Sequence, residues 1–184
     1  MNKTLKKYLL TLARYEIATK LGLVGGDVPD MGSLSNDDIL ELKKNKGTFV
    51  TLELNGKLRG CIGQILPSND MGTTIKENAI SAAFFDPRFS PLTKEEFKAI
   101  QIEISILSVP QSSSLDDVRP KTHGVIIKKG SKSATFLPQV WDELESKKDF
   151  MSQLCLKAGL AHDEWGKGTL ELKVYTVEHF NDIK

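Results

Sequence analysis

The stretch "TFVTLELNGKLRG" at residues 48–60 constrains the fold more than any other feature of this chain. Two runs rich in apolar and β-branched residues flank Asn55-Gly56, a dipeptide typical of a two-residue type I′ turn. Strand-forming runs joined by such a turn form an antiparallel hairpin. The sequence therefore predicts that one hairpin anchors a mainly antiparallel sheet.

The register of this hairpin places an arginine beside a cysteine. With a two-residue loop, Leu52 pairs with Arg59 and Val50 pairs with Cys61. Because side chains alternate along a strand, Arg59 and Cys61 then share one face of the sheet. Apolar residues on both faces predict that the hairpin is covered on both sides. A covered arginine needs an anionic partner, either a carboxylate of the protein or an anionic ligand.

The surroundings of Cys61 allow two interpretations of its thiol. Free cysteine usually behaves as a small buried apolar residue, whereas a neighbouring cation favours the reactive thiolate. Gly60 and Gly63 flank this region and leave room for close approach by a ligand or by another strand. Cys61 is therefore either a core residue or a nucleophile in a partly open pocket. The second cysteine, Cys155, falls in an amphipathic helical segment, and we expect it to be core.

Helical and strand patterns mix irregularly along the rest of the chain, and no regular βαβ repeat occurs. Helices are expected at residues 5–22, 35–42, 75–85, 93–100 and 147–159, and further strands at 101–109, 124–137 and 169–177. Capping boxes are expected at Ser35, Thr74 and Thr93. These patterns predict an α+β fold in a single domain over residues 1–184.

Composition and charge argue against several classes of function. The 25 basic and 24 acidic residues give a net charge of +1, so no overall field attracts nucleic acid or an anionic membrane. No apolar run is long enough to cross a membrane, and the first segment is no signal peptide, so the cytoplasm is the expected location. Neither cysteine has a partner at metal-ligand spacing, and no cofactor fingerprint occurs. We therefore expect no metal and no cofactor.

Several short motifs occur in the order typical of one known family. The motifs are "LRGCIG" at residues 58–63, "DPRF" at 86–89, "HGVII" at 123–127 and "LPQVW" at 137–141. Together they resemble the AMMECR-domain family, which includes the A proteins of AmmeMemoRadiSam systems. The resemblance covers nearly the whole chain and implies an α+β fold of two lobes, a larger sheet-and-helix lobe and a smaller one, with a cleft between them near "LRGCIG". It also implies partnership with a radical S-adenosylmethionine enzyme and a Memo-like protein, and it assigns no reaction.

The resemblance identifies candidate site residues at the motif positions. Candidate catalytic residues are Cys61, Arg59 and His123, and candidate ligand-binding residues are Gly60, Gly63, Asp86, Arg88 and Gln139. In the first interpretation Cys61 is a nucleophile or covalent carrier, Arg59 steers a small anionic ligand, and His123 is the base. In the second, the protein is a non-catalytic scaffold that docks to partner enzymes, and "LRGCIG" serves the fold. In that case Asp86 caps or turns the chain before Pro87, and Arg88 pairs either with Asp86 or with the C-terminus of a helix.

Overall fold

The computed structural model describes residues 1–23 and 25–182, and the chain forms two compact units. Unit 1 comprises Met1–Ile106 with Glu178–Lys184, and unit 2 comprises Leu107–Val177. Each unit has its own four-stranded sheet and its own hydrophobic core. The α+β class expected from the sequence is confirmed. The description as one domain of two lobes, and the cleft, stay predictions.

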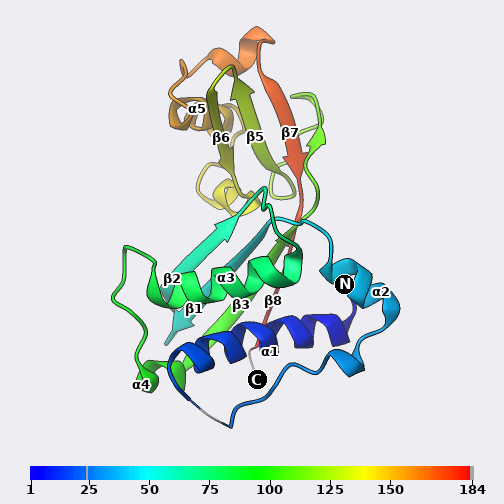
Figure 1. Ribbon diagram of the computed structural model, residues 1–184. Helices are drawn as coiled ribbons and strands as arrows, with labels where there is room; N and C mark the ends of the chain where they lie inside the picture. Colours follow the sequence, from blue (N-terminus) through cyan, green and yellow to red (C-terminus); the bar gives the residue numbers. More distant parts are fainter. Residues whose placement is uncertain (24, 183–184) are drawn as a thin grey trace. The chain divides into compact units, whose positions relative to one another are not determined.

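Unit 1 packs two long helices against one sheet (Figure 1). Along the chain its elements are α1 (Lys3–Lys20), η1 (Met31–Ser33), α2 (Asn36–Leu42), β1 (Thr48–Leu54), β2 (Lys57–Gln64), α3 (Met71–Phe84), α4 (Lys94–Phe97), β3 (Ile100–Leu107) and β8 (Val177–Asn181). The strand order is β2-β1-β3-β8, with β1 antiparallel to both β2 and β3. Strand β2 is therefore an edge strand, and it carries the "LRGCIG" motif.

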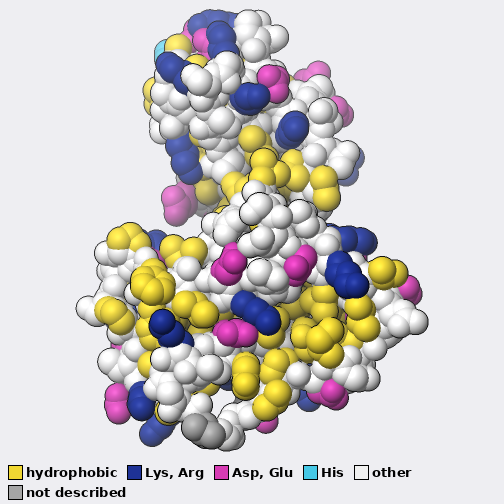
Figure 2. Space-filling model, viewed as in Figure 1, with side chains coloured by type: hydrophobic (Ala, Val, Ile, Leu, Met, Phe, Trp, Pro, Cys, Tyr) yellow, Lys and Arg dark blue, Asp and Glu magenta, His cyan; other side chains and the backbone are white. Residues whose placement is uncertain are grey.

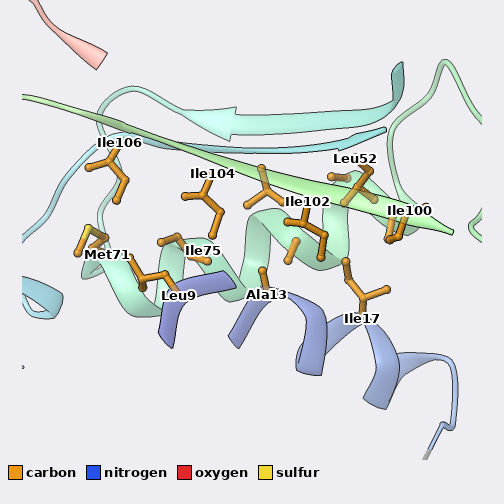
Figure 3. Close-up of a cluster of buried hydrophobic side chains, with 14 of the residues drawn as sticks. Leu9, Ala13, Ile17, Leu52, Met71, Ile75, Ile100, Ile102, Ile104 and Ile106 are labelled. Atoms are coloured by element: carbon orange, nitrogen blue, oxygen red, sulfur yellow. The ribbon is translucent and has the colours of Figure 1, made fainter. Parts of the chain in front are cut away.

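The core of unit 1 lies between helices α1 and α3 and one face of the sheet. Figure 3 shows Leu9 and Ile17 of α1 directed towards the isoleucines of β3. Buried alanines on α3 allow that helix to approach the sheet closely. Burying each large apolar side chain here contributes about 1.5–3 kcal/mol. On β1 the alternate residues Val50 and Leu52 face this core, so Thr51 between them faces the opposite side.

Two of the three expected capping boxes are confirmed. The Ser35 side chain caps α2 and the Thr93 side chain caps α4, each with its carboxylate partner three residues later. The box expected at Thr74 is wrong, because α3 begins earlier, with Asp70 accepting a hydrogen bond from the backbone N–H of Thr73. Asp70 is itself a good N-cap residue, and the earlier start places the apolar first residue, Met71, in the core.

The hairpin forms as expected, but its register changes within the strands. Asn55 and Gly56 both have positive φ, 53° and 70°, as a type I′ turn requires. A bulge between Leu52 and Glu53 then leaves Arg59 without an opposite residue, so that Leu52 pairs with Gly60. The expected pairings of Leu52 with Arg59 and of Val50 with Cys61 are therefore wrong.

The bulge has a physical cause in the packing of α3 against β2. It directs Gly60 towards the core face, where a Cβ atom would lie well inside 3.0 Å of the Ala82 carbonyl oxygen of α3. Only a residue without a side chain fits there. Cys61 consequently pairs with Thr51 and faces the side of the sheet away from the core.

Unit 2 is a smaller sheet with one helix. Its elements are β4 (Gln111–Ser112), β5 (Gly124–Lys129), β6 (Lys132–Phe136), η2 (Pro138–Asp142), α5 (Lys147–Lys157), η3 (Glu164–Lys167) and β7 (Glu171–Tyr175), with strand order β4-β7-β5-β6. Trp141 stacks on Phe150 at 3.7 Å between ring centroids. Cys155 is 0% exposed, so its expected core position is confirmed, and burial raises the pKa of its thiol.

The last expected strand, residues 169–177, is divided between the two sheets. Strand β7 belongs to the sheet of unit 2, and β8, which follows it, belongs to the sheet of unit 1. Only Thr176 separates the two strands, and no glycine, proline or asparagine marks the change of sheet.

Charges of both signs are interspersed on the face of each unit seen in Figure 2. This pattern agrees with the near-neutral net charge of the chain. Among the residues that the structure describes, no helix combines the length and apolarity needed to cross a membrane.

Candidate functional site

The Asp86 carboxylate ties the segment that follows α3 to strand β2. Its side chain is 2% exposed, and it accepts hydrogen bonds from the backbone N–H of Cys61 at 2.9 Å and from Nε and Nη2 of Arg88 at 2.9 and 2.6 Å. Arg88 Nη2 also donates to the Cys61 carbonyl at 3.2 Å. The ion pair thus satisfies both backbone polar groups of Cys61 at the edge of the sheet, where a further strand would otherwise bind.

The hydrogen bonds of this pair also fix its charges. They hold the pKa of Asp86 well below its usual range. The hydrogen bond from the Arg88 side chain lowers the pKa most, and the hydrogen bond from the Cys61 N–H lowers it further, whereas burial acts in the opposite direction. The pKa of Arg88 is raised, chiefly by its hydrogen bond to Asp86. Arg88 is therefore held as a cation beside the backbone of Cys61.

Arg59 has a different partner from the one that the first interpretation gave it. Its Nε and Nη2 donate to the two carboxylate oxygens of Glu96 at 2.9 and 3.0 Å, and Nη2 also donates to the Ser90 carbonyl at 2.9 Å. The side chain is 12% exposed, and the pairing holds the pKa of Glu96 below its usual value. Of the two partners considered for Arg59, the structure shows the carboxylate of the protein itself.

Phe89 of "DPRF" lies between the two arginines of the motifs. Its ring centroid is 5.8 Å from Arg59 Cζ and 5.4 Å from Arg88 Cζ, both within cation–π range. Arg59 Nη1 is buried and makes no hydrogen bond with any described residue. The aromatic ring therefore packs against a guanidinium that is already neutralised by Glu96.

The space at the two motif glycines is filled by the protein. A Cβ on Gly60 would collide with the Ala82 carbonyl oxygen, and a Cβ on Gly63 would collide with the ring of Phe49. Packing therefore explains the absence of a side chain at both positions. The expected room for a ligand beside Cys61 is not provided by these glycines, and their assignment to ligand binding stays a prediction.

The Cys61 thiol stands apart from the other groups of these motifs. It is half-buried on the side of the sheet away from the core, and it is not part of the hydrophobic cluster of unit 1. Its Sγ accepts a hydrogen bond from Thr51 Oγ1 at 3.3 Å. The sulfur is thus held by a polar neighbour and lies outside the core.

The other two candidate residues, His123 and Gln139, belong to unit 2. His123 Nδ1 accepts a hydrogen bond from the backbone N–H of Arg119 at 3.2 Å, which places the proton of the neutral ring on Nε2. The His123 carbonyl accepts from Trp141 Nε1 at 2.8 Å, and Gln139 is exposed on η2. The roles of His123 as base and of Gln139 in binding stay predictions.

Thr51 and Glu96 contact the candidate residues directly, although no sequence motif pointed to either of them. Glu96 was explained by its capping box, and a salt-bridge partner in a distant helix leaves no local signal. Thr51 was not connected with Cys61, because the undetected bulge led to Cys61 being placed on the face of Val50 and Leu52. Residues 1–23 and 25–182 hold no group of three or more histidine, cysteine and acidic side chains that could bind a metal ion.

This is an α+β protein whose "LRGCIG" edge strand is held by the ion pair of Asp86 and Arg88. Comparison with known proteins identifies its family. The AMMECR1 family model matches residues 10–180, so the chain belongs to the AMMECR1 family. A protein of Methanosarcina acetivorans is 38% identical over 97% of this chain and 90% of its own length, and one of Aquifex aeolicus is 36% identical over 76% of each. The crystal structure of an uncharacterized protein from Pyrococcus horikoshii matches with a TM-score of 0.80 at 29% identity, over 99% of this chain and 93% of that one.

Proposed function

We propose that this protein handles a small molecule through Cys61, whose thiolate acts as a nucleophile or covalent carrier. The position of the thiol supports this proposal. The other described motif groups around it are engaged in ion pairs or close packing, whereas the thiol is half-buried and outside the core. Cysteine is intrinsically the most nucleophilic side chain, and a nearby cation favours its thiolate.

Arg88 replaces Arg59 as the cation of the proposed site. It is 54% exposed, and its Nη1 takes no part in the bonds to Asp86 and Cys61. When a thiolate adds to a carbonyl carbon, the sulfur lone pair forms the C–S bond and the carbonyl π electrons move to the oxygen. A guanidinium N–H near the sulfur stabilises that oxyanion, or the anionic group of a ligand. The proposed ligand class is therefore a small anionic or carbonyl compound.

Selective alkylation tests this proposal. Iodoacetamide should modify Cys61 of the native protein at least about tenfold faster than Cys155, because only the thiolate of an accessible cysteine reacts readily. Peptide mass spectrometry measures both rates, and the two rates should converge in denaturant. If native Cys61 resists the reagent and Cys61→Ser lowers the melting temperature sharply, the thiol is a packing group and the proposal fails.

A second candidate is a non-catalytic binding or scaffold module in which "LRGCIG" is structural. The observation in its favour is the engagement of Arg59 with Glu96 and of Asp86 with the backbone of Cys61. This alternative predicts that Cys61→Ser leaves every binding property unchanged. The first candidate predicts that the same variant folds normally and loses its response to electrophilic ligands.

In either case we propose that the protein works with a radical S-adenosylmethionine enzyme and a Memo-like protein, as an accessory subunit. The support for these partners is the family resemblance of the motifs. Mixed with the two candidate partners encoded in the same genome, the purified protein should elute with at least one of them in size-exclusion chromatography. Separate elution of all three proteins at micromolar concentration would contradict this part of the proposal.

A further inference from the structure

We infer that Thr51 is a positioning residue for the Cys61 sulfur, an inference that rests on the function proposed for that thiol. The Thr51 hydroxyl donates its hydrogen bond to Sγ at 3.3 Å. A hydrogen bond to a charged acceptor is stronger than one to its neutral form, so this donor stabilises the thiolate more than the thiol. It also restricts the direction in which the sulfur lone pairs point.

The strand geometry holds this pair in place. Thr51 and Cys61 lie directly opposite one another across β1 and β2. The backbone N–H and carbonyl of Cys61 bond to Asp86 and Arg88, so they point away from β1. The two residues therefore form a non-hydrogen-bonded pair, the closer type, with Cα atoms about 4.5 Å apart. Because threonine is β-branched and stiff at χ1, its hydroxyl is preorganised towards the sulfur.

Other charged groups face the same pair from the neighbouring elements. Arg88 and Asp86 approach from the segment after α3, Glu103 of β3 lies opposite Thr51, and Glu53 lies two residues further along β1 on the same face. The half-buried Glu103 side chain makes no hydrogen bond or ion pair with the described part of the chain. Cys61, Thr51 and Glu103 thus form a row across three strands, in which Thr51 separates the carboxylate from the thiol.

Matched variants of Thr51 test the inference. Thr51→Val removes the hydroxyl and keeps the β-branched shape, whereas Thr51→Ser keeps the hydroxyl. The rate of Cys61 alkylation by iodoacetamide is measured across about pH 6–9 for both variants. Thr51→Val should slow the reaction about tenfold at pH 7 and displace the rate profile to higher pH, and Thr51→Ser should stay within about twofold of the parent.

Two controls keep the test decisive. Cys155 reports the folding of unit 2 within each sample, because its buried thiol reacts slowly only while that unit is intact. The melting curve reports the folding of unit 1, and Thr51→Ala replaces Thr51→Val if the valine variant unfolds that unit. Glu103→Gln changes the charge in the row without removing the bond to sulfur, and it should not slow alkylation. If Thr51→Val leaves both rate and profile unchanged while Cys61 of the parent remains reactive, the inference is wrong and the proposed function stands. If Cys61 of the parent is inert, the proposed function itself fails.

Discussion

Replacing Arg88 by methionine should lower the free energy of unfolding by about 3–5 kcal/mol at neutral pH. The Asp86 carboxylate is 2% exposed and Arg88 is 54% exposed. Removing Arg88 therefore leaves a buried charge unpaired, whereas removing Asp86 leaves an exposed one. Without Arg88 a buried carboxylate keeps only the backbone N–H groups of Cys61 and residue 88. Chemical denaturation, followed by circular dichroism, measures the change.

Replacing the other partner of the ion pair, Asp86, by asparagine provides the matched control. In Asp86→Asn the arginine side chain can turn to water. The single amide oxygen serves only one of the two backbone N–H groups, of Cys61 and of residue 88, that the carboxylate binds, so the main cost is one unsatisfied N–H, about 1–3 kcal/mol. The double variant should recover part of the stability lost in Arg88→Met, because it no longer buries an unpaired charge. If Asp86→Asn costs as much as Arg88→Met, or the double variant recovers nothing, the asymmetry argument is wrong.

The stability difference between the parent and Arg88→Met should depend on pH. The pKa of Asp86 is lowered in the folded parent, so the ion pair contributes fully above the unfolded value of about 3.9 and its contribution is lost as the pH falls towards the lower folded value. Removing Arg88 raises the folded pKa, so the variant takes up its proton at milder acidity. The difference should therefore be largest at neutral pH and shrink in acid. A constant difference from pH 7 to about pH 3 would assign the loss to packing of the arginine stem.

Local signals in the sequence predicted most of the elements of this fold. The Asn55-Gly56 turn and the capping boxes at Ser35 and Thr93 act over a few residues, and all three form. The assignment of β7 and β8 to different sheets was missed, because strand pairing partners are chosen by contacts distant in sequence. Neither strand carries a turn signal that separates it from the other.

The geometry of the candidate site also depends on a contact between residues distant in sequence. The bulge at Arg59 follows from the approach of Ala82 to Gly60, and the hairpin sequence alone contains no trace of the helix that causes it. A one-residue shift moves a side chain to the other face, so the face of Cys61 was predicted wrongly. The pairing of Asp86 with Arg88 was among the alternatives, because neighbours in sequence can pair without knowledge of the fold.

Replacing Gly60 by alanine should destabilise unit 1 by at least about 3 kcal/mol, the upper part of the range for overpacking. The atom that a new Cβ would meet is the Ala82 carbonyl oxygen, part of the backbone of α3, so no side-chain rotation relieves the collision. Helix α3 must move away from β2, and the Asp86 carboxylate that binds Cys61 follows directly after that helix. Thermal melting measures the loss, and alkylation of Cys61 should change with it.

Gly26→Ala is the matched control for this substitution, because Gly26 also lies in unit 1, has no positive φ, and has no atom within 4 Å of the point that a Cβ would occupy. It should melt within a degree or two of the parent, since replacing an exposed glycine without strain changes stability by about 0.4–1 kcal/mol at most. If Gly60→Ala melts like Gly26→Ala, α3 does not hold β2 through this contact. The bulge would then need another cause, and the position of Cys61 opposite Thr51 would lose its explanation.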